Sequence, residues 1–161
     1  MKKILIWYIL LVGYINGAGP DPMFGENGMV VSTSRQASIA GIEILKKGGN
    51  AVDAACATGF VLAVTSSSNG NVGGGGFMVV HKENSAIFTL DYREIAPAAA
   101  HQDMFLDSNS EVIDNMSLRT RAASGVPGSV DGLLKAWKDH GSGNISRREL
   151  LASAIALAER G

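Results

Sequence analysis

An arginine at the end of a strand-like run is the residue of this sequence best suited to bind a small substrate. Arg93 lies in the segment Asp91-Tyr92-Arg93-Glu94, directly after an alternating apolar run. A guanidinium can hold a carboxylate through two parallel hydrogen bonds, which orients an amino-acid-like molecule. An internal salt bridge from Arg93 to Asp91 or Glu94 is the simpler alternative. On chemistry alone, the salt bridge is favoured.

The other reactive residue types do not form recognisable sites. His81, His101 and His140 lack the spacing of metal ligands, and Cys56 is the single cysteine, so no metal site is predicted. Cys56 lies in an alanine-rich apolar run, where we expect an inert buried thiol and not a nucleophile. The serines lack the Gly-x-Ser-x-Gly turn of serine hydrolases. These residue types therefore indicate no cofactor and no recognisable nucleophilic site.

A glycine tetrad and a hairpin position Arg93. Gly73–Gly76 leads into the strand-like run Phe77–His81. Phosphate-binding glycine loops lead into a helix, so nucleotide binding is not indicated. The polar segment 82–85 connects this run to a second strand, Ala86–Tyr92, as in an antiparallel hairpin. Alternation along the second strand predicts four core-facing residues, Ala86, Phe88, Leu90 and Tyr92.

Two helices are predicted before the tetrad. A short apolar stretch at residues 28–31 suggests a strand, and Thr33 with Gln36 has the capping-box spacing that starts a helix. This helix is amphipathic and ends at Gly48-Gly49. Asn50 can cap a second helix, which is apolar almost all round from residue 51 to 64 and is expected to be buried on every side.

Two more helices are predicted after a long surface excursion. Residues 94–121 lack periodicity and are rich in loop formers. Pro127-Gly128 then opens a helix that ends at Gly141, with an apolar stripe formed by Val130, Leu133, Leu134 and Trp137. Ser146 and Glu149 form a capping box for the last helix, whose expected apolar positions are Leu151, Ala154, Ile155 and Ala158.

Four ordered blocks resemble signatures of the γ-glutamyltranspeptidase family. They are Gly48-Gly49-Asn50-Ala51-Val52-Asp53-Ala54-Ala55, Gly73-Gly74-Gly75-Gly76-Phe77-Met78, Asp91-Tyr92-Arg93-Glu94-Ile95-Ala96-Pro97 and Ser124-Gly125-Val126-Pro127-Gly128. The order and spacing of the blocks are also similar to the family's. The resemblance covers roughly residues 28–161, and it identifies residues 20–161 as the N-terminal part of the large subunit.

This resemblance implies a fold, a reaction and a role for one residue. The fold is α+β, a fragment of an N-terminal nucleophile hydrolase αββα sandwich. The reaction cleaves the γ-glutamyl bond of glutathione and passes the γ-glutamyl group to water or an amino acid through a threonine acyl-enzyme. The threonine belongs to a small subunit downstream, so the resemblance implies no catalytic residue within this chain, and the isolated chain should be inactive. The implied partners are a γ-glutamyl donor and the missing small subunit. Arg93 is implied to bind the donor α-carboxylate.

Two enzyme branches of the family and one non-enzymatic role stay open as alternatives. Ser66-Ser67 and Ser153 depart from common family residues, and these departures leave the branch undecided. A glutaryl or cephalosporin acylase and a poly-γ-glutamate depolymerase share the same scaffold. A non-catalytic exported domain is the third alternative.

The start of the chain predicts export. Residues 1–19 combine a basic pair, Lys2-Lys3, with an apolar run from Ile4 to Ile15 and a small-residue end, as in a secretory signal peptide. The run is shorter than the roughly 20 residues of a membrane-spanning helix, so a signal anchor is the alternative and a stable span is not expected after cleavage. A secreted or periplasmic location follows. With a formal net charge of −1 and no long basic run, nucleic acid is not a predicted partner.

Overall fold

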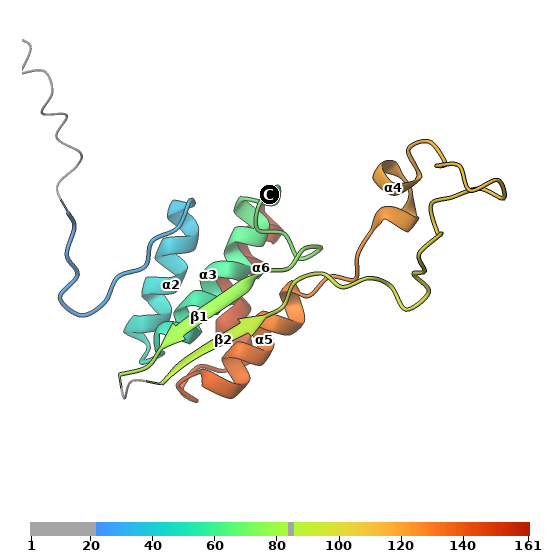
Figure 1. Cartoon of the computed structure of the whole chain (residues 1–161). Coiled ribbons are helices and arrows are strands. Elements are labelled where there is room, and N and C mark those ends of the chain that lie inside the picture. Colours follow the sequence, from blue (N-terminus) through green and yellow to red (C-terminus); the bar gives the residue numbers. More distant parts are fainter. Residues whose placement is uncertain (1–21, 84–85) are drawn as a thin grey trace, which may run out of the picture.

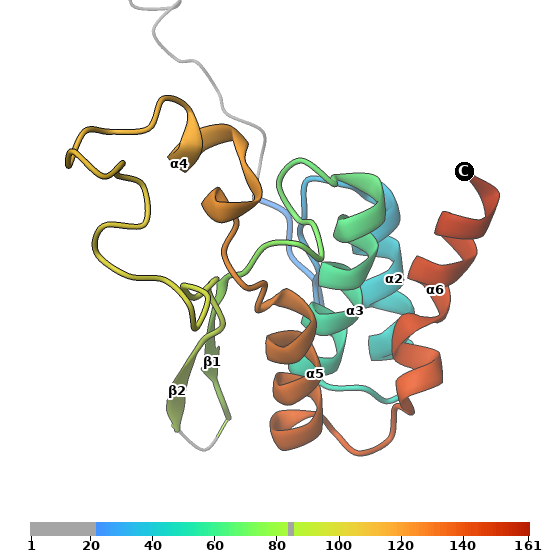
Figure 2. The same cartoon turned by 90° about the vertical axis from the view of Figure 1, so that its right-hand side faces the viewer.

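The computed structural model describes residues 22–83 and 86–161, and the predicted signal peptide at residues 1–19 lies outside them. A layer of helices packs against one side of a β-hairpin (Figures 1 and 2). This arrangement confirms the α+β class. Its elements are α2 (Arg35–Lys46), α3 (Ala51–Thr65), β1 (Phe77–His81), β2 (Ile87–Asp91), α4 (Met116–Arg119), a 3₁₀ helix η1 (Arg121–Ala123), α5 (Ser129–His140) and α6 (Arg147–Arg160).

Helix α2 begins one residue later than the sequence indicated. Ser34, and not Thr33, is the N-cap, and its hydroxyl accepts a hydrogen bond from the Ala37 backbone N–H at 3.4 Å. Serine and threonine are equivalent caps in sequence, so the choice depends on which one the fold holds in extended geometry. The predicted strand at residues 28–31 is not formed, since the structure places no paired strand beside it among the described residues.

Helix α3 is fixed at its start by a buried carboxylate. Asn50 and Asp53 form a capping box, as predicted for Asn50, and Asp53 is fully buried. One carboxylate oxygen of Asp53, Oδ2, accepts from the backbone N–H of Asn50 at 2.8 Å and from that of Ser142 at 2.9 Å. Asp53 thus joins the start of α3 to the turn after α5. Its other oxygen, Oδ1, has no hydrogen-bond partner among the described residues.

The core surrounds α3, but one face of this helix stays open. Cys56, Ala57 and Val61 are among its buried residues, and α2, α5 and α6 pack against it. Ala51 and Ala55 are exposed, so the prediction of burial on every side was wrong. Near-uniform hydrophobicity shows that a helix needs several neighbours, but it does not show that all of them lie within the same chain segment.

Helices α5 and α6 confirm the two predicted starts, with changes in their buried faces. Ser146 and Glu149 form the predicted capping box of α6, and the Trp137 indole N–H of α5 donates to the Ile145 carbonyl at 3.0 Å. Val130, Ile155 and Ala158 were expected on the apolar stripes but are exposed. Their positions lie at the margins of the apolar stripes, where sequence periodicity does not decide burial.

The hairpin has two different faces. Antiparallel pairing aligns Met78 with Leu90 and Val80 with Phe88. Met78, Val80 and Leu90 pack against the helical core, and Phe88 stacks on His140 at the end of α5. The alternation predicted for the second strand is confirmed at Phe88 and Leu90, and Tyr92 also packs against the core. It was wrong at Ala86, which lies before β2 and is exposed. The opposite face exposes large apolar side chains, namely Phe77, Val79 and Ile87.

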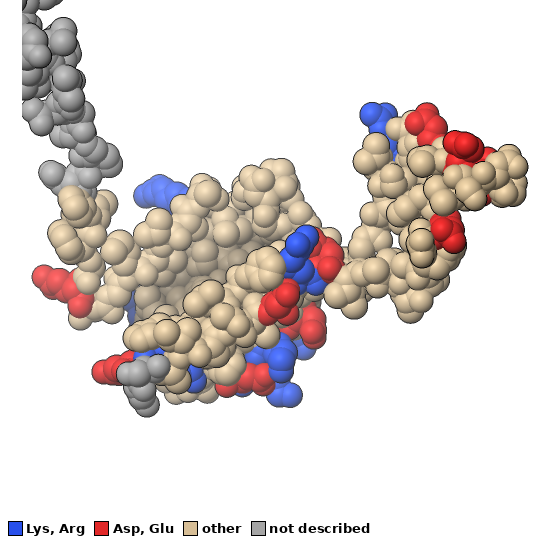
Figure 3. Space-filling view, in the orientation of Figure 1, with Lys and Arg blue, Asp and Glu red and all other residues tan. Residues whose placement is uncertain are grey.

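The long excursion extends away from this body as an arm, residues 96–125 (Figures 1 and 3). The arm carries α4 and η1. The two ends of the arm meet at an antiparallel bridge between Ile95 and Val126, with N–H···O distances of 3.2 and 2.8 Å. Among the described residues, no helix combines the length and hydropathy that crossing a membrane requires.

Candidate functional site

Arg93 is the second residue after the end of β2, and it follows Tyr92, whose main chain continues the pairing of the hairpin. The backbone N–H of Tyr92 donates to the Gly76 carbonyl at 3.0 Å, and the Gly76 N–H donates to the Tyr92 carbonyl at 3.3 Å. The glycine tetrad and the segment around Arg93 are therefore adjacent in space, as the predicted hairpin required. The structure brings together two of the four sequence blocks at this point.

The fourth block, residues 124–128, joins the same place. The backbone N–H groups of Gly128 and Ser129 both donate to the carbonyl of Gly74 at 3.0 Å. The start of α5 is thereby tied to the tetrad, while the bridge between Ile95 and Val126 secures the chain beyond Arg93. Three segments that are separate in sequence therefore meet around one residue.

The guanidinium of Arg93 is only loosely held by its neighbours. Its Nε lies 3.9 Å from the nearer Glu94 carboxylate oxygen, and its side chain is 64% exposed. The Asp91 carboxylate accepts a hydrogen bond from the Arg93 backbone N–H at 3.0 Å, and it forms no salt bridge to the guanidinium among the described residues. The internal salt bridge considered from sequence is thus absent at Asp91 and long at Glu94. A pair so exposed adds little stability.

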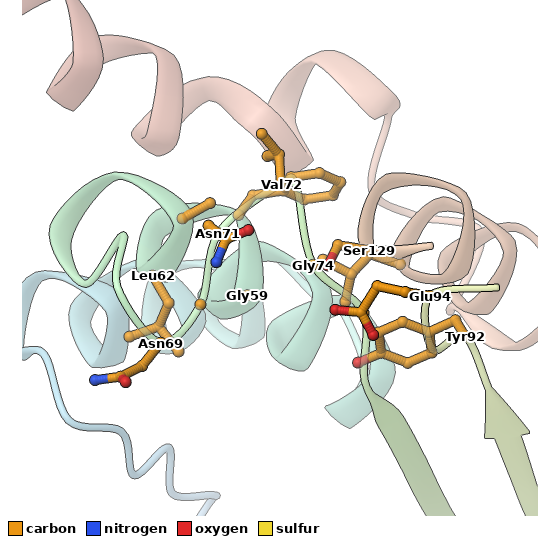
Figure 4. A pocket seen from close by; sticks show the side chains of 14 residues that line it. Gly59, Leu62, Asn69, Asn71, Val72, Gly74, Tyr92, Glu94 and Ser129 are labelled. Carbon is orange, nitrogen blue, oxygen red and sulfur yellow. The ribbon is translucent and has the colours of Figure 1, made fainter. Parts of the chain in front are cut away.

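Two hollows border this strand end. One, of about 290 Å³, is lined by Tyr92, Glu94 and Ser129 together with the polar loop containing Asn69 and Asn71 (Figure 4). The other, of about 320 Å³, is lined by Arg93 with Pro127, Asp131 and Lys135. Tyr92 contributes to both. A small charged molecule near the strand end can therefore contact polar groups from β2, the tetrad loop and α5.

Tyr92 lines both hollows and packs against the helical core. Burial raises the pKa of its hydroxyl, and the nearby Cys56 thiol acts in the same direction. The phenol is therefore neutral at physiological pH and does not add a charge to the surroundings of Arg93.

Cys56 is a structural thiol, as its sequence context indicated. It is fully buried and donates to the Leu133 carbonyl at 3.2 Å. Burial, with a smaller contribution from the Asp53 charge, raises the pKa of Cys56 to about 12. Since the thiolate is the reactive form, this cysteine is not a nucleophile at neutral pH.

The histidines stay apart from this site. His140, at the end of α5, stacks on Phe88 with ring centroids 3.7 Å apart. Within residues 22–83 and 86–161, no three His, Cys, Asp or Glu side chains are grouped as metal ligands.

Sequence reasoning missed the contribution of α5 to the site. Gly128, Ser129 and Gly132 approach the segment around Arg93, whereas the sequence indicated Pro127-Gly128 only as a helix start and as the end of a family block. The spacing of Gly128 and Gly132, four residues apart on one helical face, was a usable signal because it marks a surface that permits close approach.

Comparison with known proteins decides the family. A sequence model described as γ-glutamyltranspeptidase matches residues 37–161, which include all the residues of the site. The chain belongs to the γ-glutamyltranspeptidase family.

Relatives and solved structures of γ-glutamyltranspeptidases agree with this assignment. The glutathione hydrolase proenzyme of Pseudomonas aeruginosa is 48% identical over 84% of this chain and 24% of its own length. The crystal structure of Helicobacter pylori γ-glutamyltranspeptidase superposes with a TM-score of 0.81 at 42% identity, covering 87% of this chain and 40% of that one. A cephalosporin acylase from Bacillus halodurans is less similar, with a TM-score of 0.69 at 26% identity over 90% of this chain and 27% of that one.

The chain spans about a quarter of the length of the curated glutathione hydrolase proenzymes that it matches. It corresponds to an N-terminal part of the γ-glutamyltranspeptidase fold.

Proposed function

We propose that the full-length protein containing this chain cleaves the γ-glutamyl bond of glutathione and transfers the γ-glutamyl group to water or an amino acid. The observation that carries this proposal is the exposed guanidinium of Arg93. It lies just beyond a strand end where three segments of this chain meet, and each segment contains a block that resembles the γ-glutamyltranspeptidase family. We assign Arg93 to the donor α-carboxylate, which a guanidinium can bind through two hydrogen bonds. The greater similarity to γ-glutamyltranspeptidases than to the cephalosporin acylase favours glutathione over glutaryl substrates.

The bond-making step requires residues outside this chain. A threonine hydroxyl oxygen attacks the γ-carbonyl carbon, the amide C–N bond breaks, and the departing amine receives the proton that the threonine released. Water or an amino acid then attacks the resulting ester and frees the threonine. The contribution of this chain is to hold the donor, so that the γ-carbonyl is presented to the nucleophile.

We also propose that the hairpin belongs to one sheet of an αββα sandwich. The apolar outer face formed by Phe77, Val79 and Ile87 supports this assignment, because a second sheet packed against it would bury these side chains. The missing small subunit is the proposed source of the remaining strands.

Turnover by the purified full-length protein tests the proposed reaction. We expect hydrolysis of γ-glutamyl-p-nitroanilide and glutathione to exceed that of glutaryl-cephalosporin and poly-γ-glutamate substrates. The 161-residue chain alone should show no turnover, because acyl transfer needs the absent nucleophile and base. Preference for a glutaryl or polyglutamate substrate would instead support one of those branches. Full-length protein that folds but turns over none of these substrates would support the non-catalytic role.

We further propose that the protein is exported to the periplasm or the exterior after removal of residues 1–19. N-terminal sequencing of the exported protein should give a start near residue 20. Intact Met1 recovered from the membrane fraction would show a signal anchor instead.

A further inference from the structure

We propose that Gly75, Gly128, Gly132 and Tyr92 are positioning residues, which together form a clamp that sets the direction of the Arg93 side chain. This inference rests on the proposed role of Arg93 in binding the donor carboxylate, and it assigns the residues through which that role is achieved. The glycines of the clamp contact the main chain around Arg93 and the side chain of Tyr92. In this proposal, no member of the clamp contacts the substrate.

The need for such a clamp follows from how weakly the guanidinium itself is held. Its carboxylate neighbour, Glu94, lies at 3.9 Å, and its Cζ lies 6.0 Å from the centre of the Phe77 ring. Neither contact fixes a direction in the way that a close, two-pronged salt bridge would. The course of the main chain at residue 93 therefore decides where the guanidinium can reach.

Two glycines hold that main chain through direct backbone contact. A Cβ on Gly75 would lie 2.6 Å from the Arg93 Cα and 2.7 Å from the Glu94 backbone nitrogen. A Cβ on Gly128 would overlap the Tyr92 carbonyl oxygen. Backbone atoms cannot move aside as a flexible side chain can, so any larger residue at either position must displace the strand end. These two glycines approach the segment from the tetrad and from the start of α5.

The Tyr92 ring supplies a third point of attachment. It lies between Gly76 and Gly132 of α5. A Cβ on Gly76 would meet the ring atoms at 3.0–3.1 Å, and a Cβ on Gly132 would overlap the Tyr92 Cβ. Successive side chains of an extended segment point to opposite faces. With Tyr92 held against the helices, the Arg93 side chain extends to the opposite face of the segment, toward Phe77, and the bridge between Ile95 and Val126 ties down the main chain beyond it.

Substitution of two members of the tetrad in the full-length protein tests the clamp. We expect Gly75→Ala to raise the KM for γ-glutamyl-p-nitroanilide roughly tenfold with a smaller change in kcat, because displaced anchoring groups impair positioning. Gly73→Ala is the matched control. A Cβ there would meet only the end of the Asn71 side chain, at 3.2 Å, so its KM should stay near wild type.

A double-mutant cycle with Arg93→Ala separates positioning from general structural damage. If Gly75 acts through Arg93, Gly75→Ala should raise KM in the wild-type background but not in the Arg93→Ala background. If Gly75→Ala yields no processed protein, Tyr92→Ala takes its place in the same cycle, since it removes the ring without inserting an atom.

The outcomes distinguish the clamp from the role of Arg93 itself. An unchanged KM in Arg93→Ala would overturn the proposed carboxylate anchor. Two results would overturn the clamp alone, provided that Arg93→Ala raises KM. One is an equal KM in Gly75→Ala and Gly73→Ala. The other is a rise in KM from Gly75→Ala that persists in the Arg93→Ala background.

Discussion

Arg93→Ala in the full-length protein is expected to lower kcat/KM for γ-glutamyl donors roughly ten- to a hundredfold, mainly through KM. This range corresponds to the loss of one charge-assisted interaction, about 1.5–3 kcal/mol. Arg93→Lys should not restore binding, because an ammonium does not reproduce the two parallel hydrogen bonds of a guanidinium. Self-cleavage of the precursor should persist in both variants. Steady-state kinetics with γ-glutamyl-p-nitroanilide and gel analysis of processing provide the measurements.

If Arg93 has a purely structural role, the opposite result is expected. In that case, replacement would lower the melting temperature and leave the donor KM near wild type. Asp91→Asn is the appropriate comparison, because Asp91 accepts from the Arg93 backbone and not from its guanidinium. The asparagine keeps an acceptor for that hydrogen bond, so we expect its KM to change less than that of either arginine variant.

Of the variants considered for stability, Asp53→Ala is expected to lower the free energy of unfolding most, by about 2–4 kcal/mol. The substitution leaves two part-buried backbone N–H groups, those of Asn50 and Ser142, without their acceptor, and each such group costs roughly 1–3 kcal/mol. It also disconnects the start of α3 from the turn after α5. Urea unfolding of the full-length protein measures the change.

Two variants control for this interpretation. Asp53→Asn retains one oxygen that can accept both hydrogen bonds, so it should be clearly more stable than Asp53→Ala. Glu149→Ala removes the carboxylate of the exposed capping box of α6 and should have a smaller effect than Asp53→Ala, because water can satisfy the groups it leaves. Equal losses in the two Asp53 variants would argue against the acceptor role.

Local signals were sufficient for most of the elements and for the position of Arg93. The alternation of β2, the cap at Asn50 and the capping box at Ser146 depend on residues within a few positions of one another, and each was predicted. Arg93 was placed correctly at the end of a hairpin strand because the length of a strand and the polarity of its connection are both local properties. Its role in binding a carboxylate came from the family resemblance, and it stays a prediction.

Features that depend on distant contacts were not accessible in the same way. The choice of Ser34 over Thr33 as a cap, the open face of α3 and the exposure of Ile155 are set by what packs nearby. The contact between Gly132 and Tyr92 joins residues far apart in sequence, and no single-sequence pattern indicates which aromatic ring will lie against a helical glycine. The glycine spacing on α5 showed only that something approaches closely.

The bridge between Ile95 and Val126 has a consequence for how the family can vary. It closes the arm at its base, so the arm is attached to the site as a loop whose ends have fixed positions. The entropy of closing a flexible loop changes by only about 0.6 kcal/mol for each doubling of its length. Insertions and deletions between residues 96 and 125 should therefore accumulate among homologues at low thermodynamic cost, while the stem beside Arg93 keeps its length.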